Sequence, residues 1–191
     1  MHADYSVELG PDDDVLEIPW SSPNGSLRYY DLRLHPELID EIAEAVANPA
    51  LKEFLVAVNG HSAWSSAKCD VWYSEELNPE EDIYGGRCKF GSYVDLVLAD
   101  QLRVIPDRRP PFEAHERLLK RLVQMVEKAP EIPASTEFIL RRCYLHRVGS
   151  VDEGFYVTLY VFGYGADAGE ARRRWADALN IVQNPVLQVS K

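Results

Sequence analysis

Residues 137–182 read EFILRRCYLHRVGSVDEGFYVTLYVFGYGADAGEARRRWADALNIV, and this stretch decides the fold. Its β-branched and aromatic residues favour strands over 137–148 and 155–165. The loop between them, Gly149–Gly154, contains two glycines and an aspartate, which favours a tight antiparallel connection. We therefore predict a β-hairpin followed directly by a helix.

The second strand of this hairpin has two apolar faces, because side chains alternate along a strand. One face carries Phe155, Val157, Leu159 and Val161. The other carries Tyr156, Thr158, Tyr160, Phe162 and Tyr164. We expect the first row to pack under helices. The second, aromatic row needs a cover from the chain itself, a ligand or a partner.

The helix after the hairpin has a clear start signal. Asp167 as N-cap and Glu170 three residues later form a capping box. Apolar residues then recur at helical spacing and predict a buried stripe that faces the hairpin: Ala171, Trp175, Ala178, Leu179 and Val182. Asn184–Pro185 predicts the end of the helix, and 186–189 predicts a last short strand.

The remaining chain divides into three parts. Residues 1–26 predict an extended acidic segment that Val15, Ile18 and Trp20 can anchor as an edge strand. Residues 27–105 predict a first βαββ-type unit, and residues 106–191 a second unit of helix, hairpin and helix, with the boundary at the PDRRPP stretch, 106–111. The first unit is expected to hold strands at 27–34, 51–58, 61–73 and 87–99, a helix at 36–46, and an acidic loop or short helix at 75–86. In the second unit the first helix is expected at 112–128.

This order predicts an α+β fold in one compact domain. Two βαββ-like units would form a mainly antiparallel sheet with the helices on one face. The second half is expected to be ferredoxin-like, by analogy of element order, and a fold of this kind does not fix a function.

Charge excludes one class of function. The formal net charge is −11, and it divides into −13 over residues 1–98 and +2 over residues 99–191. Attraction to phosphates supplies most nucleic-acid affinity, so an acidic chain is a poor general nucleic-acid binder. The acidity provides solubility, or it offers a surface to a basic partner.

The sequence points to a cytoplasmic protein. No long apolar run predicts a membrane helix, and the acidic first residues lack the apolar core of a signal peptide. The three cysteines, Cys69, Cys88 and Cys143, form no paired framework, which predicts reduced thiols.

Catalytic and metal-binding patterns are weak. Cys143 and His146 lie three residues apart on a strand, so they point to opposite faces and cannot act as a pair. The glycines at 163 and 165 precede a helix, but Asp167 stands where a phosphate would bind. Neither a metal-ligand spacing nor a calcium loop is present, so we expect no cofactor, no metal and no catalytic residue.

Aromatic residues are the candidate binding site. Simple alternation along 61–73 places two tryptophans on one face of that strand. Together with the aromatic row of the hairpin they give the candidate binding residues Trp64, Trp72, Tyr156, Tyr160, Phe162 and Tyr164. Aromatic side chains are favoured at interfaces and in ligand pockets. The alternative is that the chain or a second subunit covers this face as ordinary core.

These features favour a non-enzymatic binding or protein-interaction module that uses the aromatic sheet face and the acidic first half. We expect a basic protein partner or a homo-oligomer, and neither nucleic acid nor a membrane. The alternative function is a small-molecule-binding domain with a pocket between the two units and weak enzymatic activity.

Overall fold

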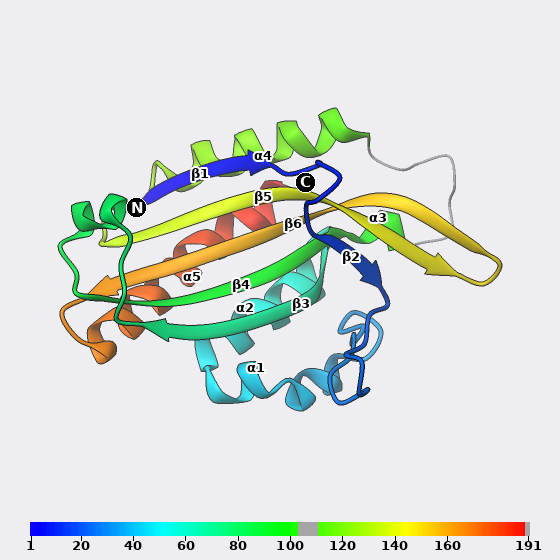
Figure 1. Cartoon of the computed structure of the whole chain (residues 1–191), viewed down its shortest axis with the longest axis horizontal. Helices are drawn as coiled ribbons and strands as arrows, with labels where there is room; N and C mark the ends of the chain where they lie inside the picture. The colour runs from blue at the N-terminus through cyan, green and yellow to red at the C-terminus, as the bar shows by residue number, and fades with distance from the viewer. Residues whose placement is uncertain (103–110, 190–191) are drawn as a thin grey trace.

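The computed structural model describes residues 1–102 and 111–189 and has an α+β fold (Figure 1). Within these ranges a mixed sheet contains six strands: β1 (His2–Val7), β2 (Val15–Ile18), β3 (Trp64–Ser74), β4 (Cys88–Leu98), β5 (Ala134–Arg147) and β6 (Ser150–Gly165). The strands follow the order β1-β5-β6-β4-β3, and β2 pairs with a later part of β5. The four longest strands pair antiparallel, whereas β1 and β2 run parallel to β5.

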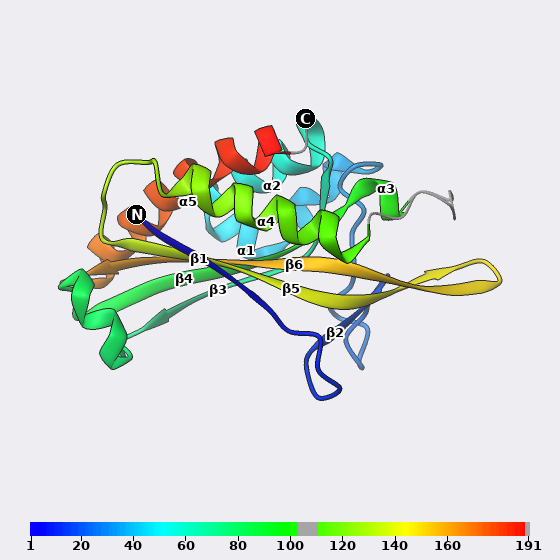
Figure 2. The ribbon, with the colours of Figure 1, turned by 90° about the horizontal axis from the view of Figure 1, so that it is seen from above.

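The helices form a second layer. They are α1 (Ala43–Ala47), α2 (Pro49–His61), α3 (Ala99–Leu102), α4 (Phe112–Val126) and α5 (Ala168–Val189), with the 3-10 turns η1 (Pro36–Glu41) and η2 (Pro79–Tyr84). Figure 2 shows α1, α2, α4 and α5 together on one face of the sheet. The main core lies between these two layers, as the amphipathic patterns predicted.

The predicted hairpin is confirmed as β5 and β6. Phe138 pairs with Leu159 and Leu140 with Val157, and all four are buried on the helix side of the sheet. Gly149 turns the chain with a φ of 83°, a left-handed conformation that glycine adopts without strain. Alternation in the sequence therefore predicted both the pairing and the face that packs on the helices.

Helix α5 packs on β4 through the side chain of the predicted tryptophan, and on β6 through its backbone at Gly163. Trp175 is 1% exposed, its Nε1 donates a hydrogen bond to Ser92 Oγ at 2.8 Å, and its ring meets Phe90 edge-on at 4.8 Å. A Cβ on Gly163 would lie 2.1 Å from the backbone nitrogen of Trp175. The glycine before the helix therefore allows the helix backbone to contact β6, which is a packing role.

The segment 51–58 is helical, and the strand predicted there is wrong. Pro49 occupies a first-turn position of α2. The buried residues Leu51, Phe54, Leu55 and Val58 then follow helical spacing. Asn59, expected in a hairpin turn with Gly60, lies in the last turn of α2 and bonds back to the Leu55 carbonyl at 2.8 Å. The local Asn-Gly signal was outweighed by burial of this apolar stripe.

Two further boundaries differ from the prediction. Helix α5 continues through Pro185 to Val189, so no strand forms at 186–189. A proline inside a helix costs about 3 kcal/mol or more. Burial of Pro185, Val186 and Val189 offsets that loss. The strand expected at 27–34 is also absent, and this stretch carries a single bridge between Ser21 and Arg28.

The N-terminal segment joins the sheet edge through β2, at the position expected for an edge strand, and also through β1, which the sequence did not predict. Ala3 pairs with Thr136 in β1, and Leu16 pairs with Cys143 in β2. The sheet combines β3 and β4 of the first predicted unit with β5 and β6 of the second. Of the predicted boundary, 106–111, only Pro111 lies within the described residues.

Candidate functional site

The sheet face opposite the helices, called here the open face, carries a cluster of four aromatic side chains. They come from three neighbouring strands: Trp72 from β3, Tyr93 from β4, and Tyr160 and Phe162 from β6. All four are partly exposed. We call these residues the aromatic cluster.

The four rings contact one another in several geometries. The ring of Trp72 lies 5.8 Å from Phe162 and 6.3 Å from Tyr160, edge-on in both cases. Tyr160 and Phe162 are stacked at 6.1 Å, and Tyr93 lies 5.9 Å from Tyr160. Aromatic pairs at these distances prefer such offset and edge-on arrangements. The cluster is therefore a connected apolar patch in the middle of the open face.

Gly91 makes room for this cluster. It lies in β4 between Trp72 on β3 and Phe162 on β6. A Cβ at this position would sit 2.8 Å from Phe162 Cδ1 and 3.1 Å from Trp72 Cε2. The two rings meet over β4 because no side chain stands between them.

One end of the aromatic row is covered by the N-terminal segment. Tyr156 is 3% exposed and belongs to a small second core with Leu16 and Ile18 of β2. Figure 2 shows β2 on the side of the sheet away from the helices. Tyr156 is therefore not available on the surface, in contrast to its place among the candidate binding residues.

The other end is covered by η2. Tyr164 is 2% exposed, and Tyr84 stacks on its ring at 4.2 Å. The Tyr164 hydroxyl donates to Glu81 at 3.0 Å, and Lys89 pairs with the same carboxylate at 2.8 Å. Tyr164 is thus core as well. Chain segments cover both ends of the row and leave its middle open.

Trp64 is not on the open face, so its predicted pairing with Trp72 is corrected. Trp64 is 1% exposed and lies in the main core on the helix side. A register shift between Ser66 and Lys68 marks a β-bulge in β3, which inserts one residue and reverses the alternation. Before Ala67 the even-numbered residues of β3 face the helices, and after Ala67 the odd-numbered residues face them.

Sequence reasoning missed Tyr93, Gly91 and Tyr84. In β4, Tyr93 is the neighbour of the buried Val94, so strict alternation along the predicted strand 87–99 places Tyr93 on the open face. The sequence does not predict the role of Gly91, because that role depends on which strands flank it in the sheet. Tyr84 lies in a segment predicted only as an acidic loop or short helix.

Carboxylates surround the aromatic cluster. Asp70 lies beside Tyr93 in the β3–β4 register, Glu137 lies beside Tyr160, and Asp4 follows next to Glu137. Within residues 1–102 and 111–189, none of these three pairs with a lysine, arginine or histidine. These three carboxylates are therefore open to a cation, whereas the nearby Lys68 and Lys89 lie over rings of the cluster.

Asp95 is a buried carboxylate next to this cluster. It accepts a hydrogen bond from Thr158 Oγ1 at 2.7 Å, and Arg141 donates to that same hydroxyl at 3.1 Å. Burial raises the pKa of Asp95 to about 6, although the hydroxyl of Thr158 and the charges of Lys68 and Arg141 act in the opposite direction. Its carboxylate titrates just below neutral pH.

The thiols of Cys69 and Cys143 are poor nucleophiles. Burial, with Glu44 as the next contribution, raises the pKa of Cys69 to about 12. Burial together with Glu153 raises the pKa of Cys143 to about 12. Thiols with such values stay protonated at neutral pH. All three cysteines are free, and no cluster of metal-ligating side chains occurs in the described part of the chain.

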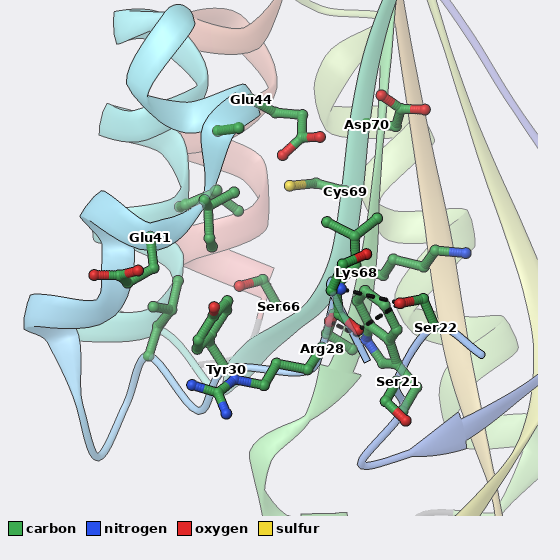
Figure 3. A pocket seen from close by; sticks show the side chains of 18 of the residues that line it. Ser21, Ser22, Arg28, Tyr30, Glu41, Glu44, Ser66, Lys68, Cys69 and Asp70 are labelled. Atoms are coloured by element: carbon green, nitrogen blue, oxygen red, sulfur yellow. Dashed lines mark hydrogen bonds between the residues drawn. The ribbon is translucent and has the colours of Figure 1, made fainter. Parts of the chain in front are cut away.

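A cavity of about 530 Å³ lies at the edge of β3 (Figure 3). Its walls come from the segment 20–32, from η1 and α1, and from five successive residues of β3, 66–70. Figure 3 shows Glu44 of α1 and Cys69 of β3 pointing towards each other across this space, with Lys68 and Asp70 on the other side of the strand. The cavity meets the open face at Tyr93, which also lines it.

In comparisons with protein-family models, curated proteins and solved structures, none matches this chain. A search of the described helices finds none with the length and apolar character needed to cross a membrane.

Proposed function

We propose that this protein is a non-enzymatic binding module whose open face takes a basic protein partner. The observation that supports this proposal is the uncovered middle of the aromatic row. Chain segments bury Tyr156 and Tyr164 at its two ends, while the aromatic cluster between them stays partly exposed. Contiguous exposed apolar patches with polar borders are typical of interaction sites.

The cluster is suited to cationic side chains. Lys89 Nζ lies 5.4 Å from the centre of the Phe162 ring, and Lys68 Nζ lies 5.9 Å from that of Tyr93. The chain thus already places its own ammonium groups against these rings. The attraction of a cation to a ring face grows when water is excluded. A lysine or arginine of a partner would find the rings of Trp72 and Tyr160, over which no lysine or arginine lies among the described residues, beside the carboxylate of Asp70.

Charge favours a basic partner over the other candidates. A second copy of the chain would bring Asp70, Glu137 and Asp4 against carboxylates of the same kind, and like charges across an interface are costly. Single-stranded nucleic acid can stack on sheet aromatics, but its phosphates would be repelled by the same border.

Affinity purification from the native host tests the proposal with three baits. The wild type is compared with Tyr160→Ala, and Tyr144→Ala serves as the control. Tyr144 is exposed on the opposite side of the β5–β6 hairpin. We expect the wild type and the control to retain the same basic protein, and Tyr160→Ala to lose at least nine tenths of it.

Equal recovery of that protein on all three baits would refute binding through the aromatic cluster. A folded Tyr160→Ala variant is required, so thermal melts accompany the experiment. We expect its melting temperature to fall only moderately, because Tyr160 is partly exposed.

The second candidate function is small-molecule binding, and the cavity beside β3 favours it. Its volume lies within the range of ligand sites. The lining residues fall between 20 and 93, so the cavity lies between the N-terminal segment and the first unit. Native mass spectrometry of the protein from its own host would reveal a retained ligand as added mass. We expect the mass of the bare chain if binding is confined to the open face.

The ferredoxin-like relation of the second half and the two βαββ-like units stay predictions. The second half has the order α4, β5, β6, α5 on which the first of these predictions rests. Binding on the open face requires only a sheet with one uncovered side.

A further inference from the structure

β3 forms one end of the sheet, and β1 forms the other. β3 is last in the strand order, and it pairs with β4 alone among the described strands. An edge strand presents unpaired backbone groups to any extended chain that reaches them. The segment from Lys68 to Ser74 is therefore a possible template for one more strand.

Two hydrogen bonds show that backbone groups of β3 point outward along this edge. The carbonyl of Ala67 accepts from Trp20 Nε1 at 2.7 Å, so a side chain takes the place of a neighbouring strand there. The N–H of Val71 donates to the carboxylate of Asp70 at 2.7 Å, so it is not used in the ladder to β4. Trp20 thus closes one end of the edge, and the part beyond it is accessible.

The cavity runs along this edge. It is lined by Ser66 and Cys69, whose side chains lie on the helix side, and by Lys68 and Asp70, whose side chains lie on the open face. Residues from both faces of one strand can line the same space only where that space adjoins the strand edge. Figure 3 shows the opposite wall, formed by η1 and α1.

A strand added here would send alternate side chains to two different places. On one side they would enter the cavity, where Glu41 and Glu44 stand on the far wall. On the other side they would lie beside Asp70, next to the aromatic cluster. Among the described residues none of these carboxylates has a lysine or arginine partner.

The two basic side chains that line the cavity, Arg28 and Lys68, already contact aromatic rings. Arg28 lies over the ring of Tyr30 at 5.4 Å, and Lys68 lies over Trp20 at 5.5 Å.

We propose that an extended basic segment of the partner adds to β3 as an edge strand and places its basic side chains against Glu44 in the cavity and Asp70 on the open face. Backbone hydrogen bonds give affinity in this mode of recognition, and the alternate pockets give specificity.

Because this inference rests on the proposed function, its test separates the two. A library of random ten-residue peptides displayed on phage is selected on the whole protein, and the most enriched peptide is synthesised. We expect lysine or arginine on both sets of alternate positions of that peptide, because one set faces Glu44 in the cavity and the other faces Asp70 on the open face. Absence of any enriched peptide, or enrichment of peptides without basic residues, would overturn strand addition.

The synthesised peptide is then titrated against Val71→Pro and Val71→Ala. Proline removes the outward N–H and is tolerated at sheet edges, whereas alanine keeps the N–H and controls for the lost side chain. We expect at least tenfold weaker binding to Val71→Pro and a change below threefold for Val71→Ala. Equal affinities for both variants would overturn the inference.

A peptide with N-methyl groups on alternate backbone nitrogens provides the same test on the wild type, in case Val71→Pro does not fold. We expect at least one of the two N-methyl registers to bind tenfold more weakly or worse.

A further variant, Tyr160→Ala, reports on the open face. If Tyr160→Ala weakens binding while Val71→Pro and N-methylation do not, the open-face proposal stands and strand addition is refuted. If only the backbone changes weaken binding, strand addition stands without the aromatic cluster.

Discussion

Gly91 shows how one residue without a side chain shapes a surface. In Gly91→Ala the new methyl group would press on the rings of Phe162 and Trp72. Inserting a methyl group into a packed site costs typically 1–3 kcal/mol. We expect a loss of about this size in the free energy of unfolding, measured by denaturant titration, together with weaker binding of the partner.

Gly60→Ala is the matched control for that change. Gly60 lies in helix α2, and outside the helix's own nearby backbone no atom lies within 4 Å of a Cβ at this position. Alanine is a better helix residue than glycine by about 1 kcal/mol. We expect this variant to be slightly more stable and to bind normally. Equal effects of the two substitutions would contradict the role assigned to Gly91.

Asp95 makes stability depend on pH. Its pKa is raised from 3.8 to about 6 in the folded protein. Between these values the folded state binds more protons than the unfolded state, so this group lowers stability as the pH rises from 4 to 6. Two units of pKa correspond to about 3 kcal/mol.

Asp95→Asn removes that titration and can keep the hydrogen bond from Thr158. We expect the difference in unfolding free energy between the variant and the wild type to move in favour of the variant by about 2–3 kcal/mol from pH 4 to pH 7. Urea unfolding at several pH values measures it. A difference that stays constant with pH would show that Asp95 titrates at its ordinary pKa.

At the scale of elements, the packing of α5 on the sheet depends on Trp175, whose side chain contacts β4. Its indole is buried, bonded to Ser92 and in contact with Phe90. Trp175→Ala should cost roughly 3–5 kcal/mol through lost burial and a cavity. Denaturant unfolding measures this cost, and Trp175→Phe should lose less because it keeps a ring in place. A cost below about 1 kcal/mol for the alanine variant would contradict this packing.

Elements with strong alternation could be predicted from the sequence, and those set by the rest of the fold could not. The hairpin and the start of α5 followed from local patterns that agree with their burial. Residues 51–58 form an apolar run that is compatible with a strand, and their buried residues also recur at helical spacing. Burial of that helical stripe in the tertiary core favours the helix α2. The bulge near Ala67 adds one residue to β3 and changes no local propensity, so alternation placed Trp72 correctly and Trp64 on the wrong face.

The candidate site was predictable to the same extent. Alternation identified Tyr160 and Phe162 as outward-facing aromatics. It could not show that Tyr156 and Tyr164 would be covered, because their covers, β2 and η2, lie far away in the sequence. The cavity depends on the same long-range contacts.

At the scale of the whole molecule, burial limits the access of thiol reagents to the three cysteines. Cys88 and Cys143 are buried, and Cys69 is partly buried with a raised pKa. We expect three thiols to react with a thiol reagent in the unfolded protein without prior reduction, and fewer to react quickly in the folded one. A count of one after unfolding would indicate a disulfide.

The parallel pairing of β1 and β2 with β5 also orders events in time. Ala3 pairs with Thr136 and Leu16 with Cys143, so during synthesis the first strands must wait until most of the chain has left the ribosome. Contacts between such distant segments form late, because closing a long loop costs entropy first. Until β2 docks, Tyr156 has no cover from Leu16 and Ile18. A chain in which β5 and β6 have paired before β2 docks would present a longer aromatic row than the finished protein, and a partner or chaperone that meets this state would encounter a wider surface.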